Sequence, residues 1–306
     1  KESTPDREAQ PEPAEPQYPE TRLKWYSFVS VWVVILCSGI GVLDYGIHLC
    51  NEHLGSTWEL RVAIDTSETA NAVHRRTFEK MFPKCVVVNH TITSEPDKTL
   101  ECIEKYFPRD LWRNSWWHAS PSCKKGSTAN FNRQEIDICC KGTMDAYRVL
   151  KAADPAQFTI EQISRVMKYI ELPNAVRIQL EEHCQLRQNR SRMIASKKPL
   201  KLVKYEGPQD EPTPEERFGK KYKMRLPLVL QNSHGATKEA SNNTFTVTGS
   251  PMKVGESLGA CMRAIDCEDV EWLMSVPHGI FQWPDGMKSR SKMEWYAQGI
   301  PCNFGK

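Results

Sequence analysis

The stretch from Trp25 to Leu43, WYSFVSVWVVILCSGIGVL, is nineteen residues long and contains no charge. As a helix it would measure about 28 Å, close to the roughly 30 Å hydrocarbon thickness of a bilayer. A helix buried in a protein core usually keeps a polar stripe, but from Val29 to Leu43 only Ser30, Cys37 and Ser38 are even mildly polar. The stretch therefore predicts a transmembrane helix, which we place at residues 25–45.

The residues that flank this stretch support the same interpretation. Trp25 and Tyr45 stand near its two ends, where aromatic rings favour the membrane interface. Arg22 and Lys24 precede it, while acidic residues predominate after it, so the positive-inside rule places the large C-terminal part across the membrane. The chain begins with Lys1 rather than methionine, and removal of a segment upstream of a retained span is typical of an organelle presequence.

Ten of the eleven cysteines follow the predicted span. An oxidising compartment such as the intermembrane space or a secretory lumen would allow them to pair. A zinc site is disfavoured, because it needs two pairs of ligands at short spacings and the sequence has none. We therefore expect no metal and several disulfides of open connectivity. The disulfide candidates are Cys50, Cys85, Cys102, Cys123, Cys139, Cys140, Cys184, Cys261, Cys267 and Cys302.

Composition and apolar periodicity together divide the chain into four parts. Residues 1–24 are rich in proline and glutamate and should form an extended tail, since they cannot bury enough apolar surface to order themselves. The predicted span at 25–45 comes next. Residues 50–195 are predicted to form a helical, Cys-rich domain, and residues 196–306 an extended arm with a mixed C-terminal segment. The predicted fold class is mainly α with minor β: a transmembrane helix, a disulfide-stapled helical domain and long extended arms.

Individual elements follow from the same patterns. CVVVNHTIT is predicted to be a strand or an extended link, and LPLVLQN and NTFTVTG are short strand candidates. NSWWHASPSCKKGST is interpreted as an irregular loop. In FTIEQISRVMKYIEL, Thr159 and Gln162 have the spacing of a capping box, which predicts a helix, and Pro173 should open another. The remaining predicted helices cover about 67–82, 94–107 and 132–153, together with CEDVEWLMSV and KSRSKMEWYAQ.

No constellation of catalytic or cofactor-binding residues is found. The motifs G-x-S-x-G, G-x-x-x-x-G-K-[ST], G-x-G-x-x-G and H-E-x-x-H are all missing from the sequence. His118 and His234 are interpreted as ordinary surface or core histidines, and the small residues from Ser38 to Gly41 as a place where another helix could approach. We therefore expect no active site and no cofactor.

Charge and glycosylation triplets add little. The formal net charge is +3 and basic residues are interleaved with acidic ones, which gives no electrostatic case for nucleic acid. N-x-[ST] triplets begin at Asn89, Asn189 and Asn242, but a motif this permissive does not decide the compartment. We therefore expect no nucleic acid among the partners.

These observations favour a non-catalytic accessory subunit of a mitochondrial inner-membrane complex, such as a respiratory complex or the ATP synthase. Its main domain would lie in the intermembrane space, and its partners would be other subunits and the lipid bilayer. The alternative is a type II membrane glycoprotein of the secretory pathway with a lumenal or extracellular binding or enzyme domain. A membrane-tethered thiol oxidoreductase is disfavoured, because the sequence has no C-x-x-C.

Overall fold

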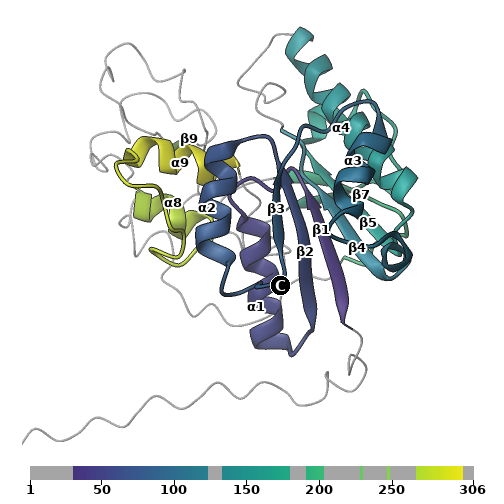
Figure 1. The fold of residues 1–306 in the computed structure, drawn as a ribbon. Coiled ribbons are helices and arrows are strands. Elements are labelled where there is room, and N and C mark those ends of the chain that lie inside the picture. The colour runs from purple at the N-terminus through teal and green to yellow at the C-terminus, as the bar shows by residue number, and fades with distance from the viewer. Residues whose placement is uncertain are drawn as a thin grey trace, which may run out of the picture.

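The computed structural model describes residues 30–122, 133–179, 191–202, 228–229, 247–248 and 267–298. These residues contain a seven-stranded sheet in the order β3-β2-β1-β4-β5-β7-β6, with helices on both faces (Figure 1). The small antiparallel pair of β8 (Leu228–Val229) and β9 (Val247–Thr248) is separate from it. The prediction of a mainly α fold is therefore wrong.

The first five strands run parallel, and β7 runs antiparallel to both of its neighbours. Parallel strands need crossover connections, which helices supply here. The strands are β1 (Val31–Leu36), β2 (Trp58–Asp65), β3 (Val86–Asn89), β4 (Ser115–Ala119), β5 (Gln157–Gln162), β6 (Val176–Gln179) and β7 (Ser191–Ser196). The helices between them are α1 (Val42–Leu54), α2 (Glu68–Phe78), α3 (Pro96–Glu104), the 3-10 helix η2 (Arg109–Asn114), α4 (Arg133–Ala153) and α5 (Ser164–Met167).

Within the charge-free stretch, Val31–Leu36 form β1, an interior strand of this sheet, rather than part of a transmembrane helix. In β1, Val33 and Ile35 pack into the apolar cluster on one face, while Val34 and Leu36 pack into the cluster on the other. A parallel strand that is covered on both faces has no solvent side, so its sequence is a continuous apolar run. Among the described residues, no helix is long and apolar enough to cross a membrane. The predicted span at 25–45 is wrong.

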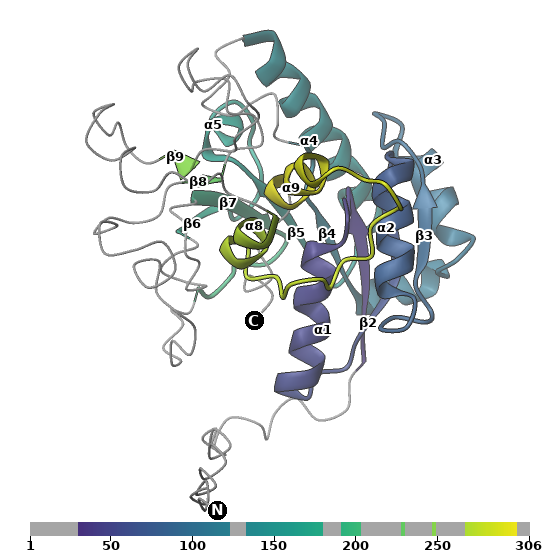
Figure 2. The ribbon, with the colours of Figure 1, turned by 90° about the vertical axis from the view of Figure 1, so that its left-hand side faces the viewer.

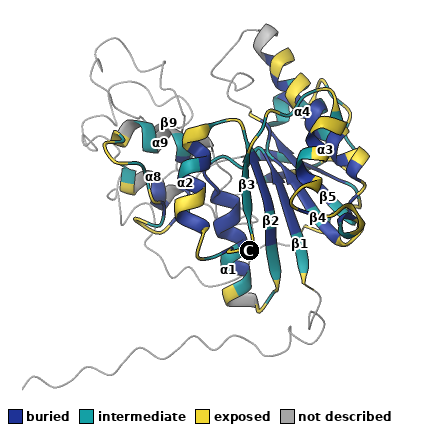
Figure 3. Cartoon of the chain, in the orientation of Figure 1, coloured by how far each residue is buried: buried dark blue, intermediate teal, exposed yellow. Residues whose placement is uncertain are grey.

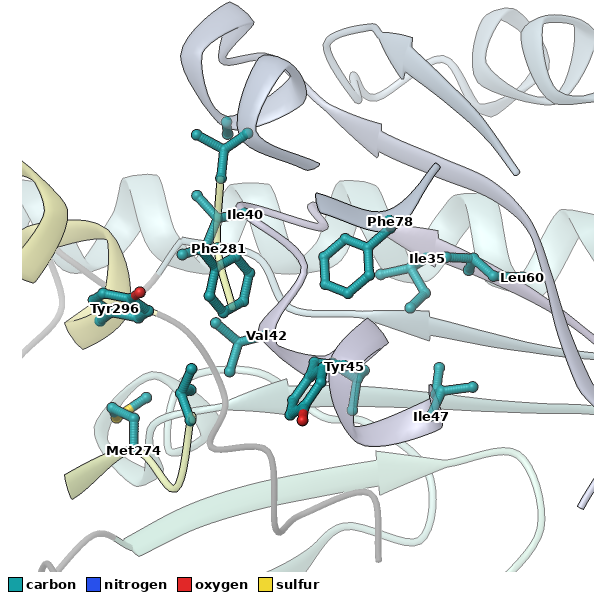
Figure 4. Packing of buried hydrophobic residues seen from close by; sticks show 14 of the residues in the cluster. Ile35, Ile40, Val42, Tyr45, Ile47, Leu60, Phe78, Met274, Phe281 and Tyr296 are labelled. Atoms are coloured by element: carbon teal, nitrogen blue, oxygen red, sulfur yellow. The ribbon is translucent and has the colours of Figure 1, made fainter. Parts of the chain in front are cut away.

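The first face of the sheet is covered by α1, α2 and a C-terminal segment that includes α8 (Cys267–Leu273) and α9 (Ser289–Gln298) (Figure 2). Figure 4 shows Phe281 and Tyr296 of this segment beside Ile40 and Val42. The Phe281 ring lies 5.8 Å from that of Phe78, measured between centroids. The C-terminal segment therefore completes a core that the N-terminal half begins.

The second face is covered by α3 and α4, which pack their apolar sides on β1, β2, β4 and β5. Trp112 and Trp117 are both fully buried there, and their rings meet edge to face at 5.1 Å between centroids. Figure 3 shows the strands buried between helices whose outer sides are exposed. The domain thus has three layers, with the sheet in the middle.

Several sequence-based elements are confirmed, with α2, α3, α4, α8 and α9 forming helices and β3, β8 and β9 forming strands where these were expected. Other elements are wrong. The stretch that begins FTIEQ forms β5, the residues after Pro173 form β6, and the supposed loop NSWWHA contains β4. A short apolar run does not by itself separate a buried strand from a buried helix.

The disulfide-stapled domain is also wrong as a description of this fold. The described cysteines are Cys37, Cys50, Cys85, Cys102, Cys139, Cys140 and Cys267, and none forms a disulfide with another of them. Cysteine packs well as a small apolar side chain, and Cys50 and Cys139 are buried in this way. Four further candidates lie outside the described residues: Cys123, Cys184, Cys261 and Cys302.

Candidate cofactor and substrate site

The sheet order reverses between β1 and β4. From β1 the chain proceeds outward to β2 and β3, whereas β4 and β5 lie on the other side of β1. The loops that leave β1 and β4 start side by side and then run to opposite sides of the sheet. Open α/β sheets bind ligands where the strand order reverses in this way, at the carboxyl ends of the strands. The backbone N–H of Ser120, just after β4, donates to the carbonyl of Leu36 at 3.2 Å. The two loops thus adjoin at this edge.

The loop between β1 and α1 has an unusual backbone. Cys37, Gly39 and Gly41 all have left-handed φ values, of 59°, 57° and 88°. A Cβ on Gly41 would lie 2.4 Å from an atom of the Phe78 ring, so that only glycine fits there. Helix α1 begins directly after Gly41, and its first backbone N–H groups face the carboxyl edge of the sheet.

Asp65, the last residue of β2, ties this loop to the next one. One carboxylate oxygen accepts from the backbone N–H of Gly39 at 2.9 Å, and the other accepts from that of Ser67 at 2.8 Å. A carboxylate oxygen can accept more than one hydrogen bond, so both retain capacity for a ligand. An acidic residue at the end of the second strand is the position that binds a ribose hydroxyl in nucleotide-binding sheets of this kind.

Ser38 lies between Cys37 and Gly39 in the same loop. Its backbone N–H donates to the carbonyl of Ile64 at 2.9 Å, which fixes the residue against β2. Its hydroxyl oxygen is buried and has no hydrogen-bond partner among the described residues. An unpaired buried hydroxyl costs about 1–3 kcal/mol, a cost that a bound polar ligand would remove.

A second group of polar side chains lies at the carboxyl end of β5. Glu161 and Arg192, from β5 and β7, form an ion pair with 2.5 Å between the Glu161 Oε1 and Arg192 Nε atoms. Both side chains are buried. The neighbouring Gln162 amide donates to the carbonyl of Pro121 at 3.3 Å, which ties the loop after β4 to β5. Buried charges persist only when they are paired, so this carboxylate has a defined orientation.

A chain of hydrogen bonds runs along β4 and β5 on the same face of the sheet. The Trp116 indole donates to the Thr159 hydroxyl at 3.0 Å, and that hydroxyl lies 2.8 Å from Nδ1 of His118. Nε2 of His118 lies 2.7 Å from the Ser120 hydroxyl. Burial lowers the pKa of His118 from 6.5 to about 3, so its imidazole is neutral.

The disulfide candidates do not form this site. The described ones are spread over α1, the turn before β3, α3, α4 and α8. Among the described cysteines, Cys37 lies in the β1–α1 loop of the candidate site, and desolvation together with the Asp65 carboxylate raises the pKa of its thiol to about 12. Such a thiol stays protonated and is a poor nucleophile. Cys123 follows Ser122 directly in the sequence and lies outside the described residues.

Sequence reasoning missed Ser38, Gly39, Gly41, Asp65, Glu161 and Arg192. One signal could have found the first four. Gly39 and Gly41 follow an apolar run, and Asp65 comes 26 residues after Gly39, close to the spacing of a nucleotide-binding fingerprint. The third glycine of that fingerprint is replaced by Asp44, which hides the motif. No pattern in the sequence pairs Glu161 with Arg192.

No family model and no curated protein sequence matches this chain. Solved structures do match. The methyltransferase EhMeth from Entamoeba histolytica aligns with a TM-score of 0.57 and 15% identity, covering 91% of this chain and 96% of that one. A mutant of DNMT2 from Spodoptera frugiperda aligns with a TM-score of 0.53 and 12% identity, covering 90% of this chain and 97% of that one. The chain therefore has the Rossmann-like fold of methyltransferases.

This likeness overturns the functional expectations drawn from the sequence. An accessory subunit of a respiratory complex or ATP synthase is wrong, as is the classification as a non-enzyme, because the fold is that of methyltransferases. The mitochondrial inner-membrane localisation and the bilayer partner depended on a span that the strand β1 replaces. The exclusion of nucleic acid is also overturned. It depended on the near-neutral net charge and on the interleaving of basic with acidic residues, whereas the fold is shared with DNMT2.

Proposed function

We propose that this chain is a methyltransferase that uses S-adenosylmethionine and acts on a base of a nucleic acid. The observation that carries the proposal is the contact between Asp65 and Gly39 at the carboxyl edge of a sheet ordered 3-2-1-4-5-7-6. It joins a glycine-rich loop, a helix N-terminus and an acidic strand end at the switch point.

The residues at this point fit the donor. The Asp65 carboxylate would accept from the ribose hydroxyls, and the buried Ser38 hydroxyl would gain the partner that it lacks. No atom lies within 4 Å of the Cβ position of Gly39, so the loop backbone there is open to the ligand, and the first N–H groups of α1 would attract the ligand's carboxylate. When bound, S-adenosylmethionine supplies a methyl group attached to a positively charged sulfur.

Glu161 supports a base as the methyl acceptor. Its carboxylate is buried at the same edge as Asp65 and is oriented by Arg192. Carboxylates accept hydrogen bonds from the exocyclic amino group of a base, and enzymes that modify bases bind them extruded from the stack. Recognition in such a pocket is local, so a net charge of only +3 does not oppose it. The fold shared with the methyltransferase EhMeth favours methyl transfer as the reaction.

The first test is donor binding, measured by isothermal titration calorimetry on the full chain. Wild type should bind S-adenosylmethionine, and Asp65→Ala should weaken binding at least tenfold, because about 1.4 kcal/mol or more is lost with a charged hydrogen-bond acceptor. Lys98→Ala is the matched control, since Lys98 pairs with Glu95 on the exposed side of α3. Absence of donor binding by wild type would contradict the proposal.

The second test is methyl transfer from radiolabelled donor to pooled RNA and pooled DNA. Glu161→Gln should keep the size of the side chain and the donor affinity but reduce transfer at least tenfold, because the amide offers a weaker acceptor and disturbs the pairing with Arg192. Incorporation of label into neither nucleic acid by a donor-binding wild type would show that the acceptor belongs to another class.

A further inference from the structure

The hydrogen-bond chain on β4 and β5 has a direction. The Trp116 indole N–H can only donate, so Thr159 Oγ1 accepts from it. The proton of the Thr159 hydroxyl is assigned to Nδ1 of His118, its other hydrogen-bond partner in the described part of the chain, because this arrangement uses that proton as well as the lone pair that accepts from Trp116. With this assignment Nδ1 of the neutral ring accepts and Nε2 carries the hydrogen. Nε2–H donates to Ser120, whose own hydroxyl proton remains available.

The hydrogen-bond chain ends at Ser120, which lies at the candidate site. In the sheet His118 pairs with Thr159. Glu161 comes two residues later on β5, and Ser120 comes two residues after His118, directly beyond the end of β4. Side chains two residues apart on a strand share a face, so Glu161 lies on the same face as Thr159. The Ser120 hydroxyl lies on that face too, because it is 2.7 Å from Nε2 of His118. The Ser120 backbone is held by Leu36, and its hydroxyl by His118. A fixed donor thus accompanies a fixed acceptor.

We propose that His118 is a positioning residue that directs the Ser120 hydroxyl toward an acceptor atom on the substrate base. Ser120 then acts with Glu161 as a two-point contact, one donor and one acceptor, on the edge of that base. This inference depends on the proposed methyltransferase function, which supplies the base. It adds Ser120 as a specificity-determining residue and explains why a histidine is buried in the middle of a sheet.

A neutral ring is essential to this role. Protonated His118 would donate from both nitrogens and could no longer accept from Thr159, so the hydrogen bond between these two side chains would reverse its direction. Because burial keeps the pKa of His118 far below neutrality, the direction of the Ser120 hydroxyl stays constant across the pH range in which enzymes are assayed. Substitution of His118 by asparagine or by glutamine distinguishes the two ring nitrogens. The side-chain amide of asparagine lies near the position of Nδ1, and that of glutamine lies near the position of Nε2.

The experiment measures steady-state methyl transfer at saturating donor for wild type, Ser120→Ala, His118→Leu, the double variant, His118→Gln and His118→Asn. We expect each of the first two variants to lower kcat/KM for the nucleic acid about tenfold, as for one lost hydrogen bond to substrate. The double variant should be no slower than Ser120→Ala, because both changes remove one coupled contact. His118→Gln should recover part of the loss and His118→Asn none. Donor affinity should not change.

A spectroscopic measurement accompanies the kinetics. Nitrogen-15 NMR of the His118 ring should show the Nε2–H tautomer from pH 8 to pH 5, in wild type and in Ser120→Ala. Losses that multiply to about a hundredfold in the double variant, full activity of Ser120→Ala, or an Nδ1–H tautomer would each overturn the positioning role. If His118→Leu fails to fold, the Ser120→Ala, Gln and Asn variants still decide the question. If any of these results overturns the positioning role while the wild type still transfers methyl groups, the proposed methyltransferase function stands. A wild type that binds no methyl donor contradicts both the positioning role and the proposed function.

Discussion

Trp117 and His118 are neighbours on β4 and are almost equally buried, at 0% and 1% exposure, yet they lie in opposite surroundings. Trp117 packs between strands and helices on the second face, in the apolar cluster that contains Trp112 and Phe158. His118 faces the other side, where its partners are two hydroxyls. The pair teaches that burial alone does not identify a core residue in this protein. The second face of β4 stabilises the fold, while the first face builds a site.

The largest expected effect comes from breaking the apolar side of this comparison. Trp117→Ala should lower the free energy of unfolding by about 3–5 kcal/mol, because it leaves a large cavity in a fully buried cluster. The part of the protein that remains folded should still bind the methyl donor with wild-type affinity, since Trp117 faces away from the site. Urea titration measures the first quantity and calorimetry the second. Equal loss of stability in His118→Gln would mean that the two faces do not differ.

A smaller effect is expected from the loop that leaves β1. Gly41→Ala should cost about 2–4 kcal/mol of unfolding free energy, because the new Cβ meets Phe78 and the backbone is left-handed. Gly39→Ala provides the matched control, since its φ is also positive but no atom lies within 4 Å of its Cβ position. It should cost only about 1 kcal/mol. Equal losses of unfolding free energy in the two variants, measured by urea titration, would mean that the Phe78 ring moves aside and that packing does not require glycine at position 41.

The smallest effect concerns pH. His118 has a folded-state pKa of about 3 against 6.5 for an ordinary histidine, so between these values the unfolded chain binds the extra proton. Stability from the neutral ring is fully present above pH 6.5 and is lost as pH falls toward 3, by up to about 1.4 kcal/mol per pH unit. Urea titrations at pH 7 and pH 5 should therefore show a smaller drop for His118→Gln than for wild type. An identical drop would mean that His118 is already charged at pH 5.

The sequence patterns that predicted elements well are those of one-sided helices. The polar outer sides of α2, α3 and α4 and the proline after α4 mark them clearly, and α4 ends at Ala153 as expected. The strands were harder to predict, because β1 and β5 are covered on both faces. In β5, Thr159 and Gln162 have the spacing of a helix cap, but their partners are His118 and Pro121, far away in the chain. Local spacing cannot reveal such partners.

The candidate site divides in the same way. Gly39, Gly41 and Asp65 form a pattern that sequence spacing could have supported, because a tight turn needs glycine wherever it occurs. Glu161, Arg192 and His118 carry no such pattern. Their partners are chosen by the crossovers that place β5 beside β4 and β7, and a buried carboxylate acquires meaning only when its partner is known.

By itself, the sequence determined that the residues around Val31–Leu36 must leave water and that glycines follow this apolar run. It also determined the positions of α2, α3 and α4 along the chain. Only the tertiary structure decided what covers that run, and it is two layers of helices rather than lipid. Hydrophobicity reports the free energy of leaving water, which is similar for a protein core and a bilayer. The contact of Gly39 with Asp65, 26 residues apart, and that of His118 with Thr159, 41 residues apart, exist because the strands are parallel and their carboxyl ends meet at one edge.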